Sequence, residues 1–243
     1  MKNSISLTFL LLTLVAEVVG TIGGFGSSVF FVPIANFYFD FETVLALTAM
    51  FHVASNLSKI ALFRKGLNKR LILYLGIPAV VFVIVGGVMA KYVNTKFLEV
   101  SLGIFLIALS LLFLIKKDLI VKDGNSEAVI GGTLSGFLAG LLGTGGAVRG
   151  LTMAAFNLEK NMFIATSAII DFGVDFTRTV VYFLNGFIRK EQLIYVPFLV
   201  LISWVGTWMG KKLLHYIPQS KFKRISLLLI LGIGMATLLR VIV

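Results

Sequence analysis

Residues 20–28 read GTIGGFGSS, and residues 140–147 read GLLGTGGA. Each of these glycine-rich stretches interrupts a long apolar run that we expect to lie in lipid. The hydrocarbon core offers no hydrogen bonds to a broken backbone, so such a break is tolerated only where protein covers it or where it lines a watery cavity. A matched pair of interrupted segments in the two halves of a membrane protein is typical of a transport site.

The composition predicts an all-α, multi-pass integral membrane protein. Of the 243 residues, 58% are hydrophobic and 14% are charged, and the mean hydropathy is +1.00. Several apolar runs of about 20 residues, bounded by charges, predict membrane-spanning helices. The first run, up to Val19, also resembles a secretory signal peptide. A counterpart at residues 128–143, which cleavage could not remove, favours a retained segment.

The charge and the scarce metal ligands exclude several classes of function. The formal net charge is +11, but most Lys and Arg lie in short loops, as is typical of the cytoplasmic side of a membrane. We therefore expect no nucleic acid partner. The chain has no Cys and two His, so we predict no disulfide, no metal site and no cofactor.

The two halves of the chain are related by an internal repeat. A shift of 120 residues aligns Gly20, Gly23 and Gly26 with Gly140, Gly143 and Gly146. A shift of 119 or 120 residues also aligns many positions downstream, as expected of a duplication with small insertions in loops. We predict one membrane domain, with residues 1–116 as the first repeat, 117–126 as a cytoplasmic linker and 127–243 as the second repeat.

Each repeat is expected to hold a broken, re-entrant helical hairpin and three transmembrane helices. The expected segments are 6–21, 27–39, 43–63, 71–92 and 97–116, then 127–142, 147–157, 161–184, 192–213 and 222–242. With hairpins the second repeat is inverted, and one side carries 13 Lys and Arg against six on the other, as the positive-inside rule prefers. A single interrupted crossing in each half, or unbroken glycine-rich packing helices, remain alternatives.

A new helix should begin after each break, and its first N–H groups have no partner within the helix. Such helix ends bind anions. The candidate substrate-binding residues are Gly23, Gly24, Gly26, Ser27, Ser28, Gly143, Thr144, Gly145, Gly146 and Arg149. The alternative is that the two serines only cap a helix. Arg149 either binds an oxyanion through its guanidinium or pairs with Glu17 or an Asp.

Polar residues form a stripe along the long helix that follows each hairpin, at 43–63 in the first repeat and at 161–184 in the second. The first stripe is Thr48, His52, Asn56 and Lys59, and the second is Ser167, Asp171, Asp175 and Arg178. Both have the spacing i, i+4, i+8, i+11, which places them on one helical face. Ionisable groups in the membrane are candidates for function, so we predict that His52, Asn56, Asp171, Asp175 and Arg178 line the pathway. Of these, Asp171, Asp175 and His52 are the expected proton carriers. An internal Asp175–Arg178 ion pair, and snorkelling of Lys59 and Arg178 to the interface, are the structural alternatives.

The paired glycine patterns resemble those of the TauE/SafE family of sulfite and organosulfonate exporters, over essentially the whole chain. The residues that carry the resemblance are Gly20, Gly23, Gly26 and Pro33, then Gly136, Gly140, Gly143, Gly145 and Gly146. The resemblance implies a permease for small sulfur-containing anions in the bacterial inner (plasma) membrane. Met153 stands opposite Pro33, and the first glycine run ends in Ser27 and Ser28, so the particular substrate stays open.

The sequence therefore predicts a secondary transporter of small anions, chiefly sulfite or small organosulfur and sulfonate anions, driven by the anion gradient or coupled to protons. It carries no nucleotide-binding loop and no nucleophile–base pair, so we expect no enzyme. The partners are a small anion and the lipid bilayer, and a homo-oligomer is left open. An anion channel, or an accessory subunit without transport activity of its own, is the alternative.

Overall fold

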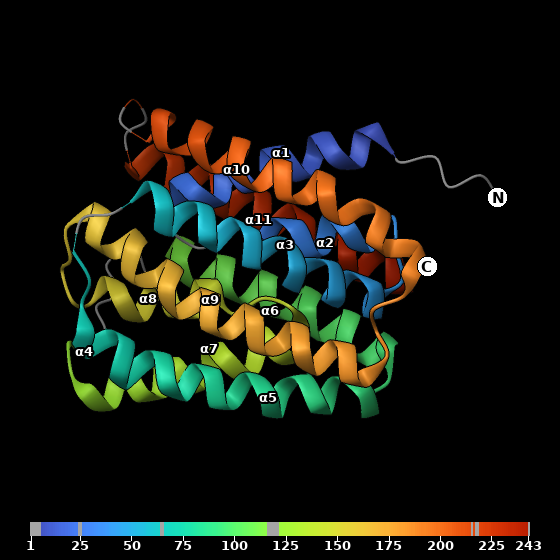
Figure 1. Cartoon of the computed structure of the whole chain (residues 1–243), viewed down its shortest axis with the longest axis horizontal. Helices are drawn as coiled ribbons and strands as arrows, with labels where there is room; N and C mark the ends of the chain where they lie inside the picture. The colour runs from blue at the N-terminus through green and yellow to red at the C-terminus, as the bar shows by residue number, and fades with distance from the viewer. Residues whose placement is uncertain are drawn as a thin grey trace.

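The computed structural model describes residues 6–23, 26–63, 66–115, 122–214, 216 and 219–242, and these residues form a bundle of helices. The helices run roughly side by side along the long axis of the molecule (Figure 1). The start of α1 and the end of α11 lie at the same end of the bundle (Figure 1). The all-helical fold predicted from the sequence is confirmed for the described residues.

The helix boundaries follow the predicted segments in both halves. The first half contains α1 (Leu7–Gly23), α2 (Ser28–Asn36), α3 (Phe41–Leu62), α4 (Lys69–Leu71), the π-helical turn η1 (Ile72–Gly76), α5 (Ile77–Tyr92) and α6 (Thr95–Ile115). The second contains α7 (Asn125–Leu142), α8 (Gly146–Ala154), α9 (Lys160–Asn185), the 3-10 turn η2 (Lys190–Tyr195), α10 (Val196–Leu213) and α11 (Gln219–Ile242). Both sets begin with a long and a short helix around a break.

Several helices are suited to a lipid environment. Within the described residues, four helical spans are long and apolar enough to cross a membrane: Phe41–Leu62, Lys69–Tyr92, Thr95–Ile115 and Lys190–Leu213. Large apolar side chains such as Phe97, Leu201 and Trp208 are exposed on the outside of the bundle. An outer surface of this kind is expected to face lipid rather than water.

Each glycine-rich break is the turn of a helical hairpin. In the first hairpin, α2 runs back along α1, so that the ring of Phe9 packs 5.9 Å from that of Phe31 and 5.3 Å from that of Tyr38. In the second, α8 runs back along α7, and the Ser135 hydroxyl donates to the carbonyl of Gly145 at 3.0 Å. The alternative of one interrupted crossing in each half does not fit this geometry.

The glycines of α7 serve two different purposes. Gly143 ends the helix in the left-handed conformation, with φ of +76°, which glycine adopts without strain. Three further glycines lie against the backbone of η1 and α5, where a Cβ would overlap the carbonyl oxygens of successive turns: Gly132, Gly136 and Gly140. These three are therefore packing residues, and the break lies beyond them.

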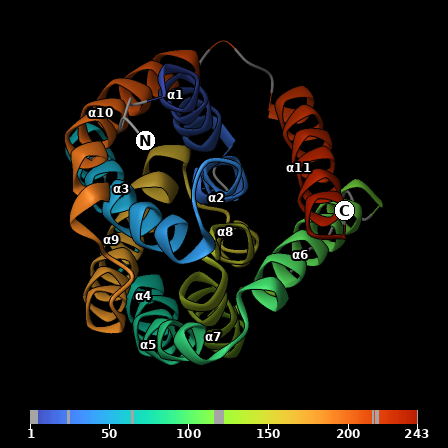
Figure 2. The ribbon, with the colours of Figure 1, turned by 90° about the vertical axis from the view of Figure 1, so that its right-hand side faces the viewer.

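The short helices α2 and α8 lie at the centre of the bundle, as the view along its axis shows (Figure 2). Around them, α5 packs against α7 and α10 packs against α1, while α3 pairs with α9 and α6 with α11. Helices α3 and α9 are antiparallel, because Asn56 contacts Asp175 while Asn68, beyond the end of α3, contacts Thr166 near the start of α9. The polar stripes of α3 and α9 therefore face each other beside the two breaks.

Candidate functional site

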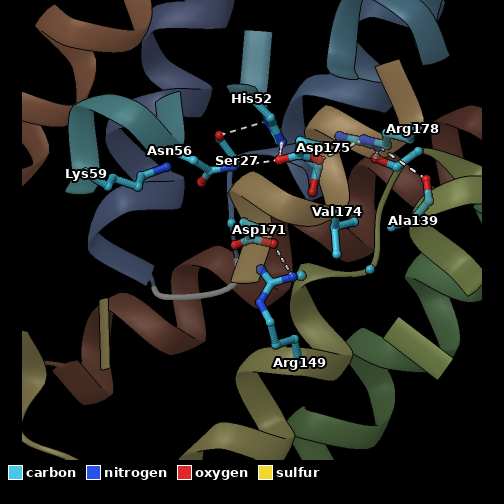
Figure 3. A pocket seen from close by; sticks show the side chains of 15 residues that line it. Ser27, His52, Asn56, Lys59, Ala139, Arg149, Asp171, Val174, Asp175 and Arg178 are labelled. Atoms are coloured by element: carbon cyan, nitrogen blue, oxygen red, sulfur yellow. Dashed lines mark hydrogen bonds and ion pairs between the residues drawn. The ribbon is translucent and has the colours of Figure 1, made fainter. Parts of the chain in front are cut away.

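A small cavity lies where the two breaks meet the polar stripes. Its wall is formed by both hairpins together with α3 and α9. The lining residues are Gly26, Ser27, Ser28, His52, Asn56, Lys59, Ala139, Gly143, Gly145, Gly146, Arg149, Asp171, Val174, Asp175 and Arg178. Figure 3 shows the charged side chains converging on this cavity from several directions.

The two breaks touch each other at the cavity. A Cβ built on Gly26 would lie 3.9 Å from the Cα of Gly146. The hydroxyl oxygens of Ser28 and Thr144 lie 3.2 Å apart. The first residues of α2 and α8 therefore lie side by side, and neither helix has a side-chain cap on its first turn. Two helix N-termini with unsatisfied N–H groups form a positive end for an anion.

The carboxylate of Glu17 is fully buried and saturated with hydrogen bonds. It pairs with the ammonium group of Lys59 at 2.9 Å. Four hydroxyl groups donate to its two oxygens, at distances between 2.5 and 3.3 Å: Thr21, Ser27, Ser55 and Thr207. Glu17 thus ties the first break to α3 and α10, and its cationic partner is Lys59 rather than Arg149.

Asp175 is held between the two polar stripes. Its carboxylate accepts a hydrogen bond of 2.6 Å from the amide of Asn56 and pairs with Arg178 at 2.7 Å. The Nδ1 atom of His52 lies 3.9 Å from the same carboxylate. On its other ring nitrogen, His52 lies 3.1 Å from the hydroxyl of Ser27. The internal Asp175–Arg178 pair considered from the sequence is therefore present.

Arg178 supports the second break as well as pairing with Asp175. Its Nη1 donates to the carbonyl oxygens of Gly143 and Ala139, at 2.8 and 3.2 Å. The hydroxyl of Tyr182 donates to the carbonyl of Gly140 at 2.6 Å. These donors satisfy the last carbonyls of α7, which have no partner within the helix.

Arg149 enters the cavity from α8 and meets α9. Its Nη1 pairs with Asp171, and its Nε donates to the hydroxyl of Ser167 at 3.2 Å. Ser167 in turn donates to Asp171 at 3.3 Å. Arg149 therefore has an Asp partner, as one of the two alternatives proposed, and it also lines the cavity (Figure 3).

Most of the residues predicted from the sequence are gathered at this cavity, whereas two of the described ones, Gly23 and Thr144, are not among its lining residues. Gly23 ends α1, and Thr144 is buried beside Ser28. Gly24 lies outside the described residues.

Ser27 stands at the N-cap of α2, but its hydroxyl contacts Glu17 and His52 and makes no cap hydrogen bond. A pure capping role for Ser27 is therefore wrong.

The alternative that Lys59 and Arg178 snorkel to the membrane interface is also wrong. Arg178 is 1% exposed and Lys59 is 9% exposed, and both side chains pair with buried carboxylates. Each guanidinium or ammonium group points into the protein because its carboxylate partner lies on a neighbouring helix or one turn away. The polar stripes therefore face the interior, as predicted.

A second small cavity adjoins the first and shares Gly26, Lys59 and Asp171 with it. Its remaining lining residues come from the end of α1 and the first half of α9: Gly20, Thr21, Phe163, Ile164, Ser167 and Ala168. It therefore extends from the central cavity toward the end of the bundle where α3 ends and α9 begins.

The structure adds residues that sequence reasoning missed. The hydroxyls of Thr21, Ser55 and Thr207 surround Glu17, and Tyr182 holds the end of α7. Isolated hydroxyls are common in membrane helices, so they give little signal in one sequence. In the part of the chain that the structure describes, no group of three or more His, Asp or Glu side chains could hold a metal ion.

Apolar helices around a polar cavity, with paired ions at helix breaks, define a membrane transporter rather than a soluble domain. The comparison with known families is more specific. Residues 9–237 match the model of the family described as sulfite exporter TauE/SafE, so the chain belongs to this family, as the sequence resemblance implied.

A curated relative points to the same class of protein. The chain is 29% identical over 181 residues to the probable membrane transporter protein MJ0441 of Methanocaldococcus jannaschii. This similarity covers 65% of the chain and 67% of the relative. No solved structure matches the chain. The chain is thus a multi-pass membrane transporter of the TauE/SafE family.

Proposed function

We propose that this protein is a secondary transporter of small anions in the bacterial inner membrane. The proposed substrate is sulfite or a small organosulfur or sulfonate anion. The observation that carries the proposal is the meeting of two helix N-termini, α2 and α8, at one buried cavity. Each helix end has a partial positive charge of about half an elementary charge. Lys59, Arg149 and Arg178 add cationic groups to the same wall.

The electrostatic balance of the cavity favours an anion over a cation. The three cationic side chains are matched by Glu17, Asp171 and Asp175. The two helix ends are an additional positive contribution on the cavity side, with no side-chain cap to compensate them. A sulfur oxyanion can accept hydrogen bonds from these N–H groups and from the hydroxyl of Ser28.

Inverted repeats are part of the proposal, and three relationships support them. The equivalent residues Asn56 and Asp175 contact each other, and so do the equivalent residues Gly26 and Gly146. Gly86 packs on Phe137, while its equivalent Gly206 packs on Glu17, the equivalent of Phe137. Such self-contacts and exchanged contacts arise around a two-fold axis between the halves. Since α3 and α9 are antiparallel, that axis crosses the helices and would lie in the membrane plane.

The topology can be tested with single cysteines, because the chain contains none. With inverted repeats, Asn94→Cys and Lys190→Cys should react with a membrane-impermeant maleimide from outside the cell. Leu67→Cys and Glu159→Cys should react only after the membrane is opened. Labelling of Leu67→Cys and Lys190→Cys from the same side would contradict the inverted arrangement.

The function itself is tested by purifying the protein and screening anions for thermal stabilisation. The panel is sulfite, thiosulfate, sulfoacetate, sulfolactate, sulfate and bicarbonate, and the proposal expects one or a few sulfur anions to raise the melting temperature. In proteoliposomes the same anion should be transported with saturable kinetics. Flux that does not saturate would favour an anion channel, and no transport by the protein alone would favour an accessory subunit.

Proton coupling through Asp171, Asp175 and His52 is the remaining part of the proposal. It is supported by ionisable side chains that line the central cavity inside the bundle. A proton gradient across the proteoliposome should then drive anion accumulation. If Asp171→Asn and Asp175→Asn both left transport and its pH dependence unchanged, coupling through these carboxylates would be excluded.

A further inference from the structure

Arg149 is shared between an internal carboxylate and the place where the two breaks meet. Its Nη1 pairs with Asp171, and its Nε donates to Ser167. Its Nη2 faces the first break, since a Cβ on Gly26 would lie 4.0 Å from this atom. Two nitrogens of the guanidinium therefore contact α9, while the third faces the first break.

Asp171 is the least restrained of the three paired carboxylates. Its side chain is 16% exposed, compared with 4% for Asp175 and 0% for Glu17. Glu17 is fixed by four hydroxyls and Lys59, and Asp175 is fixed by Asn56 and Arg178. The described contacts of Asp171 are Arg149 and Ser167. Asp171 also lines both cavities, so it lies where they join.

We infer that Asp171 is an internal substitute for the transported anion: its carboxylate and the substrate oxyanion compete for the guanidinium of Arg149. This inference rests on the proposed anion transport. When the site is empty, Asp171 neutralises Arg149, so that the protein holds no unpaired cation in the membrane, where an unpaired charge is unfavourable. When the anion binds, it takes over Nη1 of Arg149, and Asp171 turns toward the second cavity.

The exchange makes Asp171 a specificity-determining residue. A competitor that replaces a carboxylate must carry a comparable group, with two oxygens on one atom, as sulfite, sulfonates and carboxylates do. Halides lack this group and should bind much more weakly. The competition also weakens binding to the free protein, because part of the binding energy is used to displace Asp171.

The test is a double-mutant cycle on the full chain in lipid nanodiscs, with radiolabelled sulfite as the probe. Asp171→Asn should lower the Kd for sulfite about 10-fold, and Arg149→Gln should raise it. In the Arg149→Gln background, Asp171→Asn should change the Kd less than about two-fold, because the guanidinium for which they compete is absent. Asp175→Asn is the matched control, since it removes the same charge from the same helix and cavity.

Each outcome has a definite meaning. Weaker or unchanged sulfite binding by Asp171→Asn would overturn the inference. A gain in sulfite affinity that persists in the Arg149→Gln background would also overturn it, as would the same gain in Asp175→Asn. Each of these last two results would indicate a general effect of charge. Asp171→Ser removes the same charge and should give the same gain if Asp171→Asn fails to fold. If neither wild type nor any variant binds or transports an anion of the panel, the proposed function fails as well. Binding by wild type without a gain in the variants overturns this inference alone.

Discussion

The amide of Asn56 donates a hydrogen bond of 2.6 Å to Asp175, although 119 residues separate the two in the chain. The same interval aligns the two halves, so these residues are equivalent positions that contact each other. One half supplies a neutral donor and the other an acceptor. A strictly symmetric pair would place two carboxylates or two amides face to face. A hydrogen bond from a neutral amide to a charged carboxylate therefore depends on the divergence of the two repeats.

Asn56→Ala should destabilise the protein, because a buried carboxylate loses a donor. Hydrogen bonds to charged groups contribute about 1.5–3 kcal/mol. We expect a clear fall in the melting temperature measured in detergent. Asn161→Ala is the matched control, since the Asn161 amide donates to Glu159 in an exposed position. Equal melting temperatures for the two variants would show that the Asn56–Asp175 contact contributes nothing to stability.

Lys59→Met should be more damaging than Asn56→Ala, since it leaves Glu17 buried without its cation. Breaking a buried ion pair by removing one partner costs about 3–5 kcal/mol. The double variant Lys59→Met/Glu17→Gln should recover a large part of this loss, because it removes the uncompensated charge. Thermal unfolding of the three variants measures this recovery. A double variant less stable than Lys59→Met would contradict the assigned pairing.

Arg178→Lys should weaken the second break although it keeps the positive charge. The guanidinium reaches two carbonyl oxygens at the end of α7 and also Asp175. A single ammonium group lacks this planar fork. We expect lower thermal stability and slower transport. Arg189→Lys, whose side chain is 54% exposed and lies 3.7 Å or more from its acidic partners, should behave as wild type. Loss of function in both variants to the same degree would argue against a local role for Arg178.

Gly136→Val should disrupt the packing of α7 on α5. A Cβ at this position would overlap the backbone of Ala79, which cannot move aside as a side chain could. We expect a loss of about 3 kcal/mol or more, seen as poor yield and a low melting temperature. Gly232→Ala is the control, because no atom lies within 4 Å of its added Cβ. That variant should be neutral or gain up to about 1 kcal/mol from helix propensity.

The sequence was sufficient to predict much of the fold. Long apolar runs ending in Lys or Arg predicted the longer helices, and the glycine clusters predicted the breaks after Gly23 and Gly143. The spacing of His52, Asn56, Asp171 and Asp175 predicted a buried stripe, because lipid does not tolerate such groups. These signals are local or periodic, so one chain is enough to see them.

Other features depend on contacts that leave no local pattern. Thr207 lies 190 residues from Glu17, and its hydroxyl gives no sign in the sequence that it donates to this carboxylate. Likewise, the position of Gly140 in the sequence fits both a helix break and a packing contact. Only its contact with the backbone of α5 shows that it is a packing residue. Lys59 lies near the end of a helix, where an interface position is as consistent with the pattern as a buried ion pair.

The central claim, that an anion binds between the two breaks, is tested most directly by comparing Gly26→Ala with Gly186→Ala. Both glycines are left-handed, with φ of +80° and +84°, so both variants carry a similar backbone strain of about 1–2 kcal/mol. At Gly26 the new Cβ enters the space between Gly146 and Arg149, whereas at Gly186 it meets no atom within 4 Å. We predict that Gly26→Ala weakens sulfite binding about 10-fold or more, while Gly186→Ala binds sulfite as the wild type does. Equal Kd values for sulfite in the two variants would contradict the claim.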